Sequence, residues 1–202
     1  MKNLSFVLVM MTISLFGFSQ SLENVDFISP FNEGFAAIQK DGQWSFINQQ
    51  GILIMDFRSD LVVSQNLDGS FPVFSSGRCL IEEKRNGISY FGYINTCGTK
   101  IIEPQYLNAL NFDNGLAIVL ELIKVRVGTN EVLGKNVAYD KYLEAVIDVQ
   151  GNIKGYVSPK RTNVLLDKKF LRQPPKIATK KISNNLYALL NKNNTWDIKV
   201  IN

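Results

Sequence analysis

The sequence predicts an all-β protein built from antiparallel hairpins that recur along the chain. Two phrases return: residues 31–38 (FNEGFAAI) resemble residues 112–119 (FDNGLAIV), and residues 42–51 resemble residues 90–98. Phrases that recur every few tens of residues are typical of repeat architectures, in which each unit buries its apolar face against the next. Helical periodicity is not convincing in any segment. We therefore expect about four hairpin units stacked as a short solenoid-like or curled sheet, with a propeller-like closure as the alternative.

The first hairpin is expected to be centred on Asp41-Gly42, a two-residue turn signal between apolar runs. Pairing outward from this turn sets Phe35 opposite Asn48. The apolar residues 52–55 then hold the place of a third strand.

The second hairpin is expected to be centred on Asn86-Gly87. Pairing outward from this turn sets Arg85 opposite Ile88. Each strand of this hairpin is two residues longer than its counterpart in the first hairpin, so the residues at the base of the two hairpins keep the same register. Residues 100–106 follow as an extended third strand that contains a proline, which suits an edge or a strand end.

The third unit opens with residues 112–119 and contains a much longer hairpin. Residues 120–127 and 135–146 alternate loosely between apolar and polar side chains, so we expect an extended pair of strands with its tip at residues 128–134. The segment 146–151 closes the unit.

Less regular segments connect and end these units. Residues 59–73 are expected to be a link with a turn at Asp68-Gly69, and residues 158–181 a loose basic connector that carries one short apolar run, Val164 to Leu166. The last hairpin is a degenerate copy that packs on the same domain as residues 20–157. In it, residues 185–190 match the first strand of the phrase and residues 196–202 match the second.

The first residues are typical of a secretory signal peptide. Lys2 supplies the positive region, Leu4 to Phe18 form an apolar run, and Gly17 and Ser19 are small residues before a cut near Ser19/Gln20. The run is shorter than the roughly 20 residues that span a bilayer, and no other segment is long and apolar enough to do so. We therefore expect a secreted or periplasmic protein without a transmembrane segment in its mature chain.

Composition and charge narrow the possible functions. The chain has no histidine, which removes the usual general base at neutral pH and the commonest metal ligand. Residues 154–202 hold 11 Lys and Arg against 2 Asp and Glu, whereas residues 1–153 hold 11 against 16. A solvated basic face explains this asymmetry best, and contact with an anionic partner is the alternative. The candidate anion-binding residues are Lys168, Lys169, Arg172, Lys176, Lys180 and Lys181.

Several residues recur in register and resemble the WG repeat family, also called KWG repeats. The matching residues are Phe31, Gly34, Ala36, Trp44, Ile47, Asn48 and Gly51 in the first copy, Gly77, Gly92, Tyr93, Ile94, Asn95, Gly98, Pro104 and Tyr106 in the second, and Phe112, Gly115, Leu116, Ala117, Asp148 and Gly151 in the third. Ser45 replaces the family glycine after Trp44, and Phe91 replaces the family tryptophan before Gly92. The resemblance implies an all-β interaction module of the kind common in secreted and surface proteins of bacteria, with no enzyme activity or defined ligand.

Aromatic residues at repeated positions form the candidate binding surface. These residues are Trp44, Phe46, Phe91, Tyr93 and Trp196. They could stack against sugar rings, but their recurrence in the repeat favours a buried seam between units.

Catalytic and covalent chemistry has little support in the sequence. Cys79 and Cys97 could form a disulfide after export, but the predicted register places them on opposite faces. Glu82 and Glu83 are adjacent, so they also point to opposite faces and cannot act as a carboxylate pair. The other acidic candidates, Glu103, Asp140 and Glu144, are best explained as solvated strand residues.

Phosphate loops, nucleophile–base pairs and thiol ligand clusters are not evident in the sequence, so no cofactor, metal or nucleic-acid partner is expected. We therefore predict a non-catalytic module that binds a protein or glycan of the cell envelope. A cell-wall or polysaccharide hydrolase and a structural envelope component are the alternatives.

Overall fold

A computed structural model describes residues 22–66, 68–130, 135–158 and 160–201. This part of the chain is all β and contains no helix, as the sequence predicts, and its strands form several small antiparallel sheets, none of which is closed. The predicted signal peptide lies outside the described residues. The strands are β1 (Phe27–Ile28), β2 (Phe35–Lys40), β3 (Gln43–Asn48), β4 (Ser64–Asn66), β5 (Gly69–Phe71), β6 (Cys79–Arg85), β7 (Ile88–Ile94), β8 (Lys100–Tyr106), β9 (Leu116–Asn130), β10 (Lys135–Asp148), β11 (Ile153–Tyr156), β12 (Thr162–Asn163), β13 (Thr179–Lys181), β14 (Leu186–Leu190) and β15 (Trp196–Val200).

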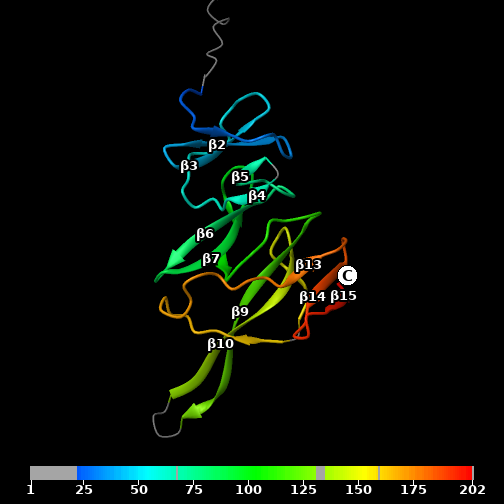
Figure 1. The fold of residues 1–202 in the computed structure, drawn as a ribbon. Coiled ribbons are helices and arrows are strands. Elements are labelled where there is room, and N and C mark those ends of the chain that lie inside the picture. The colour runs from blue at the N-terminus through cyan, green and yellow to red at the C-terminus, as the bar shows by residue number, and fades with distance from the viewer. Residues whose placement is uncertain (1–21, 67, 131–134, 159, 202) are drawn as a thin grey trace, which may run out of the picture.

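The sheets follow one another through the molecule in chain order (Figure 1). The β1-β2-β3 sheet lies at one end, the β6-β7-β8 sheet follows, and the long β9–β10 hairpin extends toward the other end. The β13-β14-β15 sheet packs beside this hairpin. In three of these sheets the middle strand pairs with the strand before it and the strand after it.

The predicted hairpin registers are confirmed. Phe35 pairs with Asn48 in the first sheet, and Arg85 pairs with Ile88 in the second. The third strand of the second sheet is β8, with the predicted bounds 100–106. In the first sheet, however, residues 52–58 form isolated bridges with β3, such as Ile47 with Leu53, and form no strand.

The Phe-x-x-Gly phrase forms a tight turn at three places in the described chain. Its glycines, Gly34, Gly77 and Gly115, have φ values of 83°, 67° and 77°, and the residue before each of them also has a positive φ. Two successive positive φ angles are typical of the turns that reverse a chain between paired strands, and glycine adopts them without steric cost.

Side chains of these turns bond one turn to the next. The Glu33 carboxylate accepts the backbone N–H groups of Ser76 and Gly77 at 2.8 and 3.0 Å. The Ser76 hydroxyl oxygen in turn accepts the N–H of Gly115 at 2.9 Å. The residue that follows Phe in the Phe-x-x-Gly phrase also bonds to the next turn, but here its side chain is the hydrogen-bond donor. Asn32 Nδ2 donates to the Phe74 carbonyl at 2.8 Å, and Ser75 Oγ donates to the Phe112 carbonyl at 2.6 Å. We call these two bonds and the three before them the turn ladder.

The turns that follow β3, β7, β10 and β14 share one geometry. Oδ1 of Asn48, Asn95, Asp148 and Asn191 accepts the backbone N–H groups two and four residues later, at 2.9–3.1 Å. Asn and Asp side chains favour such turns because they can bond to backbone N–H groups a few residues later.

The fourth of these turns corrects the sequence assignment of the last hairpin. Asn191 follows β14, so β14 corresponds to β3, β7 and β10, the strands that precede the same turn, and β15 corresponds to β8 of the second sheet. The prediction had matched residues 185–190 to a first strand and was therefore one strand early. The first strand of the last sheet is β13, which lies within the predicted connector, residues 158–181.

Apolar clusters lie between successive sheets because neighbouring residues on a strand point to opposite faces. On β6, Ile81 packs with residues of β3, whereas Leu80 packs on the other side with Val119 of β9. On β9, Ile118 points away from that second cluster and packs with Tyr187 of β14.

The connector is extended but attached to the body at several points. Its apolar residues Val164, Leu166 and Leu171 pack against a cluster that contains Leu107 and Leu120. At its end the buried Glu144 carboxylate of β10 accepts the N–H groups of residues 178 and 179 at 2.8 and 3.0 Å.

Candidate ligand-binding cleft

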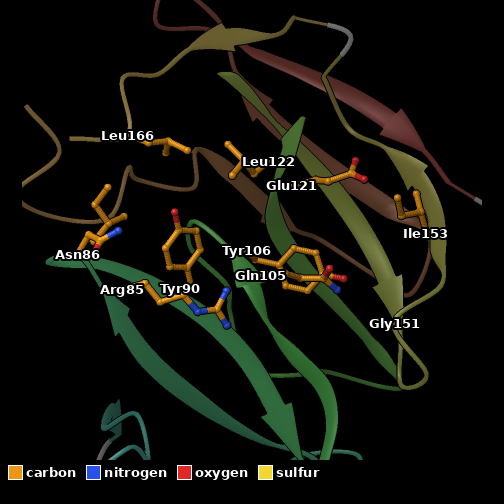
Figure 2. Close-up of a pocket in the computed structure, with 11 residues that line it drawn as sticks. Arg85, Asn86, Tyr90, Gln105, Tyr106, Glu121, Leu122, Gly151, Ile153 and Leu166 are labelled. Atoms are coloured by element: carbon orange, nitrogen blue, oxygen red, sulfur yellow. The ribbon is translucent and has the colours of Figure 1, made fainter. Parts of the chain in front are cut away.

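An open cleft of about 690 Å³ lies between the second sheet and the β9–β10 hairpin (Figure 2). Figure 2 shows Arg85, Asn86 and Tyr90 on one side and Glu121 and Ile153 on the other, with residues of β8 between them. The lining residues are Arg85, Asn86, Ile88, Tyr90, Gln105, Tyr106, Glu121, Leu122, Gly151, Ile153 and Leu166. The cleft is therefore assembled from segments that are far apart in the sequence.

Adjacent residues of β8, and of β9, line the cleft together. On β8, Tyr106 is buried and Gln105 is exposed, because adjacent side chains point to opposite faces. On β9, Leu120 is fully buried, and the next residue, Glu121, lines the cleft. The connector contributes Leu166, so its packing completes one wall.

Arg85 carries the positive charge of the cleft lining. Its guanidinium donates to the Glu83 carboxylate at 2.7 Å and lies over the Tyr90 ring, 5.2 Å from the ring centroid. The hydrogen bond to Arg85 lowers the pKa of Glu83, and the same bond raises the pKa of Arg85. Both groups are thus ionised at neutral pH, and the planar guanidinium and the ring form one stacked wall.

Glu121 carries the negative charge on the opposite side. Its Oε2 atom is buried and has no hydrogen-bond partner among the described residues. Desolvation, followed by the nearby Glu121 charge, raises the pKa of Tyr106; desolvation and a hydrogen bond to Glu121 raise the pKa of Tyr156. Both tyrosines stay protonated at neutral pH, so the Glu121 carboxylate lies beside the neutral hydroxyl groups of Tyr106, which lines the cleft, and of Tyr156.

Four of the five aromatic residues considered for sugar stacking lie in the core. Trp44 and Phe46 pack in the cluster between the first two sheets, and Phe91 and Tyr93 pack in the next cluster. Tyr93 is fully buried and donates its hydroxyl to the Leu110 carbonyl at 2.6 Å. These rings cannot form an exposed row for a ligand because the neighbouring sheets cover them. Trp196, 45% exposed, is the exception.

The basic residues of the C-terminal region are dispersed. Lys181 forms an ion pair with Asp113 at 2.9 Å, and its ammonium also donates to the Asp113 carbonyl, so it joins β13 to the third Phe-x-x-Gly turn. The ammonium of Lys180 lies 4.8 Å from the Trp196 ring centroid. Lys168 contacts the second hairpin at Gly87. Three further residues of the set, Lys169, Arg172 and Lys176, are exposed on the connector.

The cysteines and carboxylates occupy separate environments. Cys79 is buried and Cys97 is exposed, and both thiols are free. Glu82 accepts a hydrogen bond from Ser89, whereas Glu83 pairs with Arg85, so the two adjacent carboxylates face different partners. The prediction that Glu144 is a solvated strand residue is wrong. Glu144 is buried, and its carboxylate accepts hydrogen bonds from backbone N–H groups.

Within the described ranges, no group of three or more Cys, Asp or Glu side chains could hold a metal ion. The same residues contain no helix long and apolar enough to span a membrane, because they form strands and loops.

Sequence patterns did not predict the residues that line the cleft. One signal was present: Glu121 is a single charge inside the long apolar run of residues 116–123. A carboxylate in such a run needs either a partner or access to solvent, because an isolated buried charge is costly. The positions of Gln105 and Tyr90 beside it had no such signal.

The architecture defines an all-β protein of several small antiparallel sheets, with an open cleft between two of them. Residues 24–44 and 91–121 match the family model described as WG containing repeat. The predicted resemblance to the WG repeat family is confirmed in these two regions. The matches cover β1 and β2 as far as Trp44, and β7, β8 and the start of β9. Curated proteins and solved structures gave no match to the chain.

Proposed function

We propose that this chain is a non-catalytic, exported interaction module that binds a protein or glycan of the cell envelope in the cleft between its second sheet and the β9–β10 hairpin. The single observation that carries the proposal is the cleft lining itself. It combines ring faces, a guanidinium, an amide and a carboxylate in an open space of about 690 Å³. Binding sites typically contain apolar and aromatic surface with a few polar groups that orient the ligand.

The same lining favours binding over hydrolysis of a glycan. Glycoside cleavage normally needs two carboxyl groups about 5–10 Å apart, one of them able to donate a proton. Among the residues that line this cleft, Glu121 is the one carboxylate. The tyrosines beside it hold their protons at neutral pH and can serve as hydrogen-bond donors.

We further propose that the four sheets other than β4-β5 are successive copies of one repeat and that they stack in chain order. The turn ladder and the repeated Asn or Asp turn support this reading, because both recur at equivalent positions. Stacking would give the cleft rigid walls, since Arg85 and Glu121 come from different copies. Export follows from the predicted signal peptide, and mass spectrometry of the secreted protein would locate the cut.

The proposal is tested by capturing envelope fractions on the immobilised protein. We compare wild type with the variants Glu121→Gln and Tyr90→Ala, and use Gln43→Ala, an exposed change on the first sheet, as the control. Loss of capture by both cleft variants but not by the control would support the proposal. Capture that none of the changes affects would contradict it.

The salt dependence of capture distinguishes binding in the cleft from binding through the basic connector. Neutralising Lys168, Lys169 and Arg172 together should leave capture unchanged if the cleft is the site, whereas contact through the connector would be weakened by this change and by about 0.5 M salt, where exposed charges are strongly screened.

A further inference from the structure

The last strand, β15, is a free edge. It pairs with β14 and with no other strand of the described chain, and all five of its residues are exposed. Figure 1 places it at the outside of the molecule, beside β14. A free edge strand presents unpaired backbone groups that can pair with another chain, and proteins usually protect such an edge.

The exposed face of this sheet is unusually apolar. Trp196, Ile198 and Val200 of β15 are 45%, 68% and 54% exposed, and they alternate with Asp197 and Lys199. The apolar residues share one face with Leu190 of β14, because Leu190 pairs with Trp196. A contiguous exposed apolar patch of this kind marks an interaction surface.

The backbone groups on the free side of β15 can be assigned from the bonds on its paired side. The Ile201 N–H donates to Asn185 and the Thr195 carbonyl accepts from Asn191, so these odd-numbered residues point toward β14. Hydrogen-bonding direction alternates along a strand. The N–H and C=O groups of Trp196, Ile198 and Val200 therefore point outward.

We propose that two copies of this chain pair through β15, antiparallel, about a two-fold axis at Ile198. In this register Trp196 lies opposite Val200 of the second copy, and the outward backbone groups of both strands meet. Asp197 then lies opposite Lys199 of the second copy, and Lys199 opposite Asp197, so each charge meets its opposite. The occupant of the edge is thus a second copy, because residues 196–200 are self-complementary in charge and in polarity.

Competing registers are disfavoured by the same residues. A shift of two residues in one direction centres the pair on Asp197 and sets the two aspartates opposite each other. A shift in the other direction centres it on Lys199 and opposes the two lysines. A shift of one residue would bring the apolar face of one strand beside the charged face of the other. Like charges directly opposite one another destabilise strand pairing.

Sedimentation velocity of the exported protein over a range of concentrations tests the pairing. Wild type should show a reversible monomer–dimer equilibrium. Asp197→Lys and Lys199→Asp, each alone, should weaken dimerisation at least about tenfold, because each places like charges opposite one another. The double variant, Asp197→Lys with Lys199→Asp, restores opposite charges and should recover the dimer. Circular dichroism shows whether each variant keeps the fold.

A cross-link provides a second measurement that does not depend on affinity. Directly opposed residues of a hydrogen-bonded strand pair have Cα atoms about 5.5 Å apart, within the range that a disulfide spans. In a Cys97→Ser background, Ile198→Cys should oxidise to a covalent dimer, and the control Asn193→Cys, in the turn before β15, should not. Monomer at all concentrations, open-ended oligomers, no recovery in the double variant or no selective cross-link would overturn the proposal.

Discussion

At the scale of single residues, Gly92 shows why the WG phrase contains a glycine. A Cβ atom on Gly92 would lie 2.4 Å from the Ile102 carbonyl oxygen and 2.6 Å from the Pro104 nitrogen. The β7 and β8 backbones therefore approach more closely than any side chain allows. In the first sheet the matching residue, Ser45, is fully buried and donates to the Met55 carbonyl at 2.6 Å. The segment opposite Ser45 forms isolated bridges in place of a strand.

We predict that Gly92→Ala destabilises the protein by about 3 kcal/mol, because the added methyl group meets backbone that cannot move aside without breaking the β7–β8 pairing. Urea unfolding measures the change. The matched control is Ser45→Ala, which removes one buried hydrogen bond and should cost about 1 kcal/mol. Equal costs for the two variants would contradict the close approach at Gly92.

The two cysteines should react differently with a thiol reagent. Burial raises the pKa of the Cys79 thiol far above its usual value, and the side chain is 1% exposed, whereas Cys97 is exposed. Because the thiolate is the reactive form, we expect one thiol per chain to be labelled in the native protein at pH 8 and two after unfolding. Mass spectrometry locates the label. Native labelling at Cys79, or no labelling because the cysteines are joined, would contradict this expectation.

At the scale of elements, the turn ladder joins sheets that share no strand pairing. Glu33 binds two backbone N–H groups of the next turn, so Glu33→Ala should destabilise the protein by about 1 kcal/mol and speed hydrogen exchange at the Ser76 and Gly77 amides. The control Glu103→Ala removes an exposed ion pair with Lys100 and should cost about 0.5 kcal/mol or less. Unchanged exchange at both amides would show that the first two turns are not coupled.

The hairpins could be predicted because their signals are local. Asp41-Gly42 and Asn86-Gly87 determine both the turn and the register of the strands beside it, and the structure has the predicted pairs. The burial of the aromatic residues could be predicted for a related reason: apolar positions such as Trp44 and Tyr93 recur in the sequence, and both lie in apolar clusters between sheets.

The cleft and the last sheet could not be predicted in the same way. The cleft joins Arg85, Gln105 and Glu121, whose proximity depends on how the β9–β10 hairpin packs against the second sheet. Local patterns carry no information about that packing. The sequence prediction matched β14 to the first strand of the repeat phrase because the apolar run of β14 resembles that strand. The side-chain bonds of Asn191, which show that β14 precedes the repeated turn, are visible only in the three-dimensional structure.

At the scale of the whole molecule, the sheets depend on one another unequally. The second sheet contributes to apolar clusters on both of its faces, whereas the last sheet contributes to a cluster on one face and exposes the other. Lys181 and Glu144 add polar attachments that hold β13 against the body. The stability of a segment follows the apolar surface that it buries, so local unfolding should begin at the C-terminal sheet.

We therefore predict a gradient of hydrogen exchange along the molecule. Some backbone N–H groups of β15 point toward β14. At low protein concentration these amides should exchange at least about tenfold faster than the amides of β7, because β15 has one strand partner and five exposed side chains. Protection of β15 alone should then rise with protein concentration if the edge pairs with a second copy, while β7 stays constant. In the single variant Lys199→Asp this concentration dependence should disappear. Equal exchange rates in both strands at low concentration would instead show that the last sheet opens only when the whole molecule unfolds.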